Sequence, residues 1–157
     1  MGLKRVSVIG LCLAAVAAVV MLAAVIIRPP KIYISEICPS NSETSKKTAM
    51  QDKNGEPSDW IEIYNPTNKD ISLTGFSLSK NGGVDQPLGG YVIKAHDYII
   101  VYCSSAGFEN ADFPHADFSI GKVSEAEIIL KYDSLQCESI KLPKLNKGVS
   151  YSKNAKG

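Results

Sequence analysis

The feature that most constrains the fold is a series of short segments with the two-residue alternation of a half-buried β-strand. In residues 60–65, two isoleucines face one way, and a tryptophan, a glutamate and a tyrosine face the other. The next residues, 65–68 (Asn-Pro-Thr-Asn), are typical of a turn, because proline fixes φ at a turn position. No convincing helical periodicity appears after residue 28, so the sequence predicts an all-β domain.

The predicted strands recur at the regular spacing typical of an antiparallel sandwich or barrel. Polar and glycine-containing stretches separate them, and the longest of these, residues 39–58, is a loop without apolar periodicity. We expect strands at residues 32–37, 60–65, 71–73, 76–79, 91–93, 98–102, 117–120, 127–132 and 136–141.

An uncharged apolar run covers residues 6–27 and is long enough to cross a bilayer as a helix. We expect an uncleaved signal anchor there, after a basic N-terminus at residues 1–5 and before a proline-containing linker at residues 28–31. The alternative is a cleaved signal peptide, since residues 15–17 offer a small-residue site. Ten further apolar residues would then remain on the mature chain.

The flanking charges favour one orientation only slightly. A short basic N-terminus followed at once by an apolar run behaves like an export signal that is never cut. We therefore expect a single-pass protein of the cell membrane with residues 32–157 on the extracytoplasmic side. The reverse orientation would make the chain a cytosol-facing membrane scaffold.

Charge and cysteine content exclude several classes of function. Of 17 basic residues, three lie within positions 1–28, which leaves 14 against 16 acidic residues, interspersed without a basic stripe. A nucleic-acid partner is therefore not expected. The domain has three cysteines, Cys38, Cys103 and Cys137, and no C-x-x-C pair, so zinc is not expected and at most one internal disulfide can form. No cofactor is predicted.

Several segments together resemble the lamin tail domain: IYISEICPSN, DWIEIYNPT, ISLTGFSLS and FPHADFSIGKVSEAEIILKYDS. The resemblance runs from about residue 32 to residue 151, and it implies an immunoglobulin-like β-sandwich. It also implies a structural role for the residues that carry the motif, which are Asp59, Trp60, Ile61, Glu62, Tyr64, Asn65, Pro66, Leu73 and Gly75.

The chain departs from the family pattern in several places. The family often has an aspartate at the position of Glu138, and it normally adds a tryptophan-containing segment after Tyr151. Because the chain stops at Gly157, we expect either a sandwich that lacks its last edge strand or a truncated member of the family. No heptads of a lamin rod are present, so the resemblance favours a bacterial-type, membrane-anchored member.

Three groups of side chains are candidates for a site. Asp52, Asn54, Glu56 and Asp59 could supply oxygen ligands to calcium, although their spacing is not that of a helix-loop-helix calcium loop. Cys103 with His115 and Asp117 has the residue types of a nucleophilic triad, but Cys103 ends an apolar strand and is interpreted as a buried thiol. Trp60 and the seven tyrosines are interpreted as packing residues, an interpretation that a solvent-facing tyrosine would change.

These observations predict a non-enzymatic, membrane-anchored binding, adhesion or structural tethering module. Its partners would be the membrane and a protein or surface polymer, met by exposed loops or a free sheet edge. The alternative from another class is an accessory or metal-dependent module of a surface hydrolase that uses the acids of residues 52–59.

Overall fold

The computed structural model describes residues 28–41, 50–52, 54–105, 113–121 and 125–153. These residues form eleven strands and no helix, which confirms the all-β prediction. The strands are β1 (Tyr33–Cys38), β2 (Asp59–Tyr64), β3 (Ile71–Ser72), β4 (Phe76–Lys80), β5 (Gln86–Pro87), β6 (Val92–Ile93), β7 (Tyr98–Cys103), β8 (His115–Ala116), β9 (Glu127–Tyr132), β10 (Leu135–Lys141) and β11 (Tyr151–Ser152).

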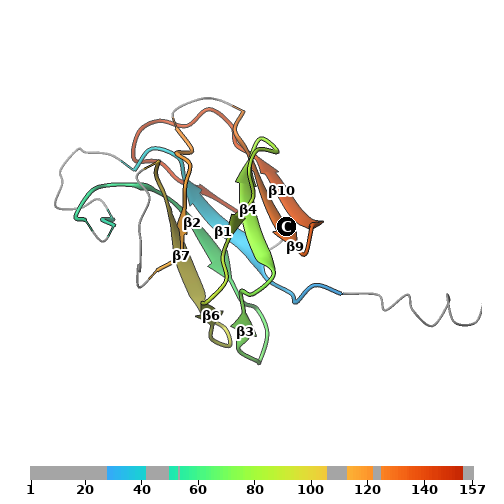
Figure 1. Ribbon diagram of the computed structural model, residues 1–157. Helices are drawn as coiled ribbons and strands as arrows, with labels where there is room; N and C mark the ends of the chain where they lie inside the picture. Colours follow the sequence, from blue (N-terminus) through green and yellow to red (C-terminus); the bar gives the residue numbers. More distant parts are fainter. Residues whose placement is uncertain (1–27, 42–49, 53, 106–112, 122–124, 154–157) are drawn as a thin grey trace, which may run out of the picture.

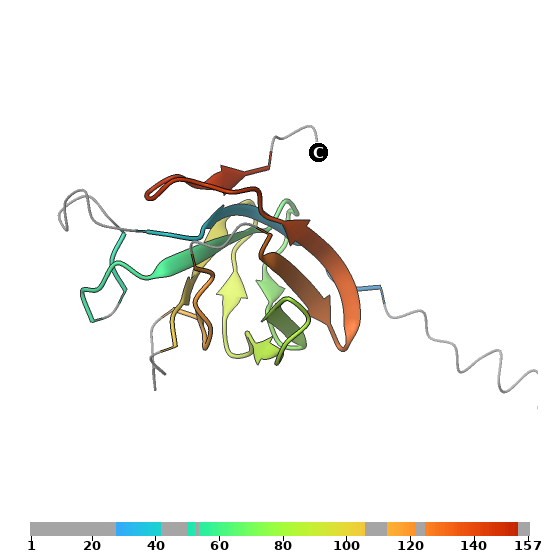
Figure 2. The same ribbon diagram turned by 90° about the horizontal axis from the view of Figure 1, so that it is seen from above.

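Two sheets face each other as the layers of a sandwich (Figures 1 and 2). One has the order β11-β1-β2-β7-β8 and the other the order β10-β9-β4-β5. A small two-stranded sheet, β3-β6, lies at one end of the molecule (Figure 1). All strand pairs among the described residues are antiparallel except β7 with β8.

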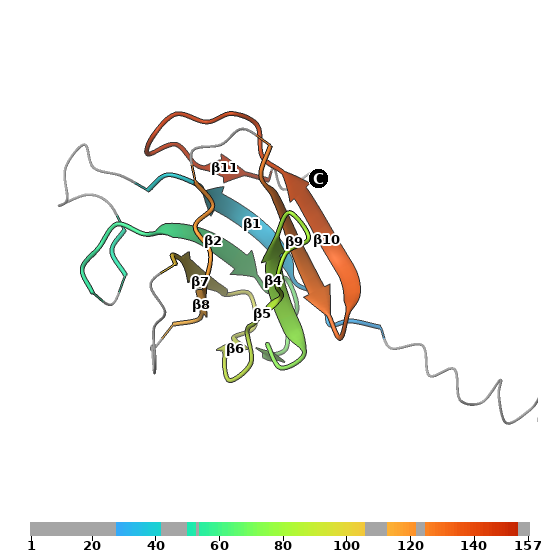
Figure 3. The ribbon, with the colours of Figure 1, turned by 45° about the horizontal axis from the view of Figure 1, so that its top comes forward.

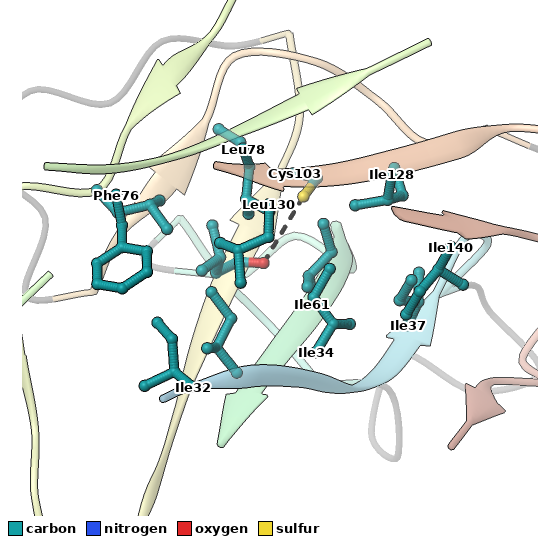
Figure 4. Packing of buried hydrophobic residues seen from close by; sticks show 14 of the residues in the cluster. Ile32, Ile34, Ile37, Ile61, Phe76, Leu78, Cys103, Ile128, Leu130 and Ile140 are labelled. Carbon is teal, nitrogen blue, oxygen red and sulfur yellow. Dashed lines mark hydrogen bonds between the residues drawn. The ribbon is translucent and has the colours of Figure 1, made fainter. Parts of the chain in front are cut away.

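The core lies between the two sheets, where the alternation of each strand points its aliphatic side chains inward (Figure 4). In β2, Ile61 and Ile63 are fully buried, as their spacing predicts. Leu78 on β4 and Leu130 on β9 belong to the same buried cluster and come from the other sheet. Phe76 packs against Tyr132 in a tilted arrangement, with ring centroids 4.8 Å apart. Aliphatic side chains therefore dominate the interior of this sandwich.

The structure differs from the predicted strands mainly at two-residue elements. Residues 117–120 form no strand; instead β8 pairs with β7 just before them. β5 is not among the predicted strands, and its Pro87 is tolerated because β5 is an edge strand. The predicted strands also do not include β11, which pairs with β1 and runs along it (Figure 3). The sheet edge beside β1 therefore carries a strand.

The expected basic N-terminus and membrane span, residues 1–27, lie outside the described residues. Within the described residues, no helix has the length and apolar character needed to cross a membrane. The linker is described at residues 28–31, and the Ile32 amide donates a hydrogen bond to the Pro30 carbonyl at 3.0 Å. This bond lies directly before β1.

Candidate binding face

Asp59, the first residue of β2, connects its strand to a distant loop. Its Oδ2 accepts hydrogen bonds from the Ser119 hydroxyl and from the Gly121 amide, both at 2.9 Å. The carboxylate thereby satisfies a backbone donor that no strand partner reaches. In this geometry Asp59 holds the residues before β9 against the start of β2.

Asn65 follows β2 and is completely buried. Its Nδ2 lies within hydrogen-bond distance of the Lys69, Ile93 and Lys94 carbonyl oxygens, at 2.7, 3.1 and 2.9 Å. Its Oδ1 accepts from the amide and hydroxyl of Thr67. One amide group thus joins the turn after β2 to the turn after β6, where the half-buried Pro66 also lies.

Leu73 and Gly75 belong to the turn that leads into β4. Leu73 is fully buried in the core. Gly75 has a φ of +87°, and an added Cβ would lie 2.9 Å from Oδ1 of Asp133 and 3.0 Å from Cε2 of Tyr132. Both the backbone conformation and the close approach of the β9–β10 turn favour glycine here.

Trp60 is buried, with 9% of its surface exposed, but it is not part of the core between the sheets. Its register partners are Cys38 on β1 and Tyr102 on β7, and the alternation of β2 places it on the outer face of the five-stranded sheet. The interpretation of Trp60 as a packing residue fits this burial, although it packs outside the sandwich rather than within it.

The four calcium candidates do not converge on one point. Oδ1 of Asp52 accepts hydrogen bonds from the Asn54 and Glu56 amides, and Oδ2 accepts from the Ser58 hydroxyl at 2.5 Å. Burial raises the pKa of Asp52, but these three hydrogen bonds outweigh burial and leave the pKa below its ordinary value. The Asn54 and Glu56 side chains are exposed, and Asp59 binds elsewhere.

Among the described residues, no group of three or more histidine, cysteine, aspartate or glutamate side chains could hold a metal ion. The carboxylate of Asp52 instead closes the turn that precedes β2. Hydrogen bonds within the chain therefore satisfy both oxygens of the Asp52 carboxylate.

Cys103 does not form a nucleophilic triad with His115 and Asp117. It lies in the core, where burial raises the pKa of its thiol well above the ordinary value, and its sulfur contacts the Val101 carbonyl (Figure 4). The His115 ring lies 3.0 Å from the Ser104 hydroxyl. Cys38, Cys103 and Cys137 are all free, with Cys137 exposed on β10.

Three tyrosines stand side by side on the outer face of the five-stranded sheet. Tyr33 on β1 is in register with Tyr64 on β2, and Tyr64 is in register with Tyr98 on β7. The rings of Tyr33 and Tyr64 meet edge to face with centroids 5.6 Å apart. Tyr98 is 57% exposed. This solvent-facing tyrosine changes the interpretation of the row from packing alone to a candidate recognition surface.

The neighbouring row of the same face carries two carboxylates. Glu36 on β1 is in register with Glu62 on β2, and Ile100 on β7 completes the row. Glu62 accepts a hydrogen bond from the Ser35 hydroxyl at 2.5 Å, and Glu36 accepts one from the Ser150 hydroxyl. We call the two rows, Tyr33, Tyr64, Tyr98, Glu36 and Glu62, the tyrosine–glutamate face.

Glu62 and Tyr64 were predicted as structural motif residues, but the sequence alone does not reveal the face that they share with their neighbours. The relevant signal is the outward alternation of each strand. It becomes a surface only when the register of three strands is known, because a shift of one residue in any of these strands would turn its tyrosine inward.

Comparison with known proteins assigns the sandwich to a family. The family model of the lamin tail domain matches residues 28–141 of the 157-residue chain, from just before β1 to the end of β10. A search of the curated proteins finds no match to this chain. The family match covers most of the chain and includes every strand of the two facing sheets except β11. The chain therefore belongs to the lamin tail domain family.

Proposed function

We propose that the chain is a non-enzymatic binding module that a membrane anchor at residues 6–27 holds on the extracytoplasmic side of the cell membrane, as in a bacterial-type member of the family. The observation that supports a binding role is the tyrosine–glutamate face. It places partly exposed aromatic rings and carboxylates on one sheet, and no catalytic constellation appears among the described residues. The function would be tethering: the anchor fixes the domain at the membrane and the face engages a partner.

The free sheet edges are weaker candidates for the same role. The outer edge of the four-stranded sheet, β10, is seven residues long but has a register shift between Gln136 and Glu138. Bulges and inward-pointing charges protect edges from pairing with other strands. Glu138 is such a charge, since it reaches across to the Ile34 amide at 2.8 Å. β5, β8 and β11 are each two residues long, which gives an added strand little to pair with.

Membrane topology tests this proposal directly. Intact cells that express the chain with a C-terminal tag are treated with an impermeant protease. Loss of the tag from intact cells is the expected result. Protection of the tag until the membrane is opened would contradict it and would support a cytosol-facing scaffold. Recovery of the whole chain in the soluble fraction would contradict the anchor itself.

A further inference from the structure

We infer that the tyrosine–glutamate face binds a cationic protein segment, one that lays lysine or arginine side chains across β1, β2 and β7. This inference rests on the proposed function, because it names the partner chemistry of the same face.

The charge of the face is unmatched within the described part of the chain. Glu36 and Glu62 are directly opposite each other on neighbouring strands, an arrangement in which like charges destabilise a sheet. Neither carboxylate forms one of the ion pairs found among the described residues. Each accepts a serine hydroxyl, which leaves its negative charge in place. A cation from a partner would remove this repulsion.

The tyrosine row supplies the second half of a cation site. An aromatic ring attracts a lysine or arginine head group through its quadrupole, and the apolar stem of the side chain can lie along the same surface. Tyr98 is exposed to solvent, and Tyr64 stands beside it in register. The row therefore presents aromatic surface directly beside the two carboxylates.

The protein already holds one ammonium in this way. Nζ of Lys153 lies 5.8 Å from the centroid of the Tyr33 ring and 3.0 Å from Oε1 of Glu138. The backbone amide of Lys153 donates to the Ser35 carbonyl, so the lysine is fixed at the rim of the face. A tyrosine ring and a carboxylate thus hold a cation at one end of the row. The same two kinds of group are offered to a partner by Tyr64, Tyr98, Glu36 and Glu62.

The spacing of the face suits an extended segment. Neighbouring strands lie about 4.8 Å apart, and on β2 the tyrosine and glutamate rows are separated by two residues, or about 7 Å. On β1 the register shift between Ile34 and Glu36 places one extra residue between the two rows. Alternate side chains of an extended peptide project at a similar interval of about 7 Å. An arginine stacked on a tyrosine therefore reaches the glutamate of the next row. A neutral sugar would stack equally well but would leave the opposed carboxylates uncompensated.

The test is a calorimetric titration of the full chain in an uncharged polyoxyethylene detergent, which has no sugar head group that could stack on the rings. The probe is a short peptide of alternating arginine and glycine, and the same peptide with glutamine in place of arginine is the control ligand. We expect heat of binding with the arginine peptide alone, weakening as salt is raised. Equal binding of both peptides, or no binding of either, would overturn the inference.

Three variants, of which two are a matched pair, locate the binding. Glu62→Gln keeps an acceptor for Ser35 and removes one charge, and it should raise Kd roughly fivefold, as expected for a partly desolvated charge contact. Asp85→Asn removes the same charge from the Lys131 ion pair on the other sheet and should leave Kd unchanged. Tyr98→Leu keeps apolar area but not the ring, and it should also weaken binding.

Each variant is first checked by thermal unfolding, and a variant that melts with the parent chain is used. An equal effect of Glu62→Gln and Asp85→Asn would show that net charge alone attracts the peptide, which contradicts a built face. Failure here is distinguishable from failure of the proposed function, because peptide binding in detergent does not depend on membrane orientation. The protease experiment can succeed when the peptide does not bind, and the reverse also holds.

Discussion

At the scale of single residues, a few buried polar side chains contribute strongly to the stability of the domain. Asn65 uses both ends of its amide with no exposure to water, and Asp52 uses both carboxylate oxygens in one tight turn. The Ser79 hydroxyl is the counterexample: it is buried, and no hydrogen-bond partner for it exists among the described residues. We therefore expect substitutions of these three residues to change the stability of the domain in different ways.

Asn65→Ala should lower the free energy of unfolding by roughly 3 kcal/mol, because it leaves several buried carbonyl and amide groups without partners. Asn65→Asp should destabilise the domain further, since it would place a carboxylate against three carbonyl oxygens. Chemical denaturation measures both, and the exposed Asn54→Ala variant is the control. A small effect of Asn65→Ala would show that water replaces the lost hydrogen bonds.

Ser79→Ala should leave the domain as stable as before or stabilise it by about 1 kcal/mol, because it removes a buried donor that no described group accepts. The melting temperature of the variant checks this. A marked destabilisation would reveal that the hydroxyl has a partner.

Acidification should expose the role of Asp52. Its pKa is lowered in the folded state, so its contribution to stability is fully present above the ordinary carboxyl pKa of about 3.9 and is lost as pH falls through the folded value. Asp52→Asn should be less stable than the parent chain at neutral pH. Its stability should also fall less steeply in acid. Parallel curves for the two proteins between neutral and acid pH would contradict this assignment.

At the scale of elements, the turns rather than the strands carry the backbone strain. The β9–β10 hairpin closes with Asp133 and Ser134, whose φ angles of +44° and +73° are those of a turn that favours asparagine and glycine. The Asp133 amide donates to the Gly75 carbonyl at 2.9 Å, so this turn also supports the turn before β4. The strained β9–β10 turn thus packs against Gly75, where a larger residue would collide with it.

Ser134→Gly should stabilise the domain by about 0.5–1 kcal/mol, because glycine adopts a positive φ without steric penalty. Gly75→Ala should act in the opposite direction, since both its φ and the contact with Asp133 oppose a Cβ. Thermal unfolding of the two variants beside the parent chain gives the comparison. Stabilisation by both, or by neither, would mean that turn conformation does not limit stability.

Strand prediction succeeded where a segment was long enough to show alternation. The six-residue strand β2 has its isoleucines inward, as predicted, because its period is unambiguous. Two-residue strands such as β5, β8 and β11 are too short to show an alternation of apolar and polar residues. They are recognised only by their pairing with neighbouring strands. The tyrosine–glutamate face escaped prediction for a related reason, because register across three strands is a property of the folded sheet.

At the scale of the whole molecule, the lamin tail domain match agrees with the two facing sheets. The family resemblance also identified Asp59 and Asn65, and the structure explains both by hydrogen bonds between distant segments. Membrane attachment and the identity of the partner depend on the protease and titration experiments proposed above. Both experiments leave the assignment to the family unaffected.

The pairing of β11 with β1 has a mechanical consequence. The strands are antiparallel, with Glu36 opposite Ser152, so the chain enters β1 and leaves β11 at the same end of the sheet (Figure 3). A force pulling on these two points would load the hydrogen bonds one at a time, as in opening a zipper, rather than shearing them together. The domain should therefore release β11 under low tension while its core stays intact.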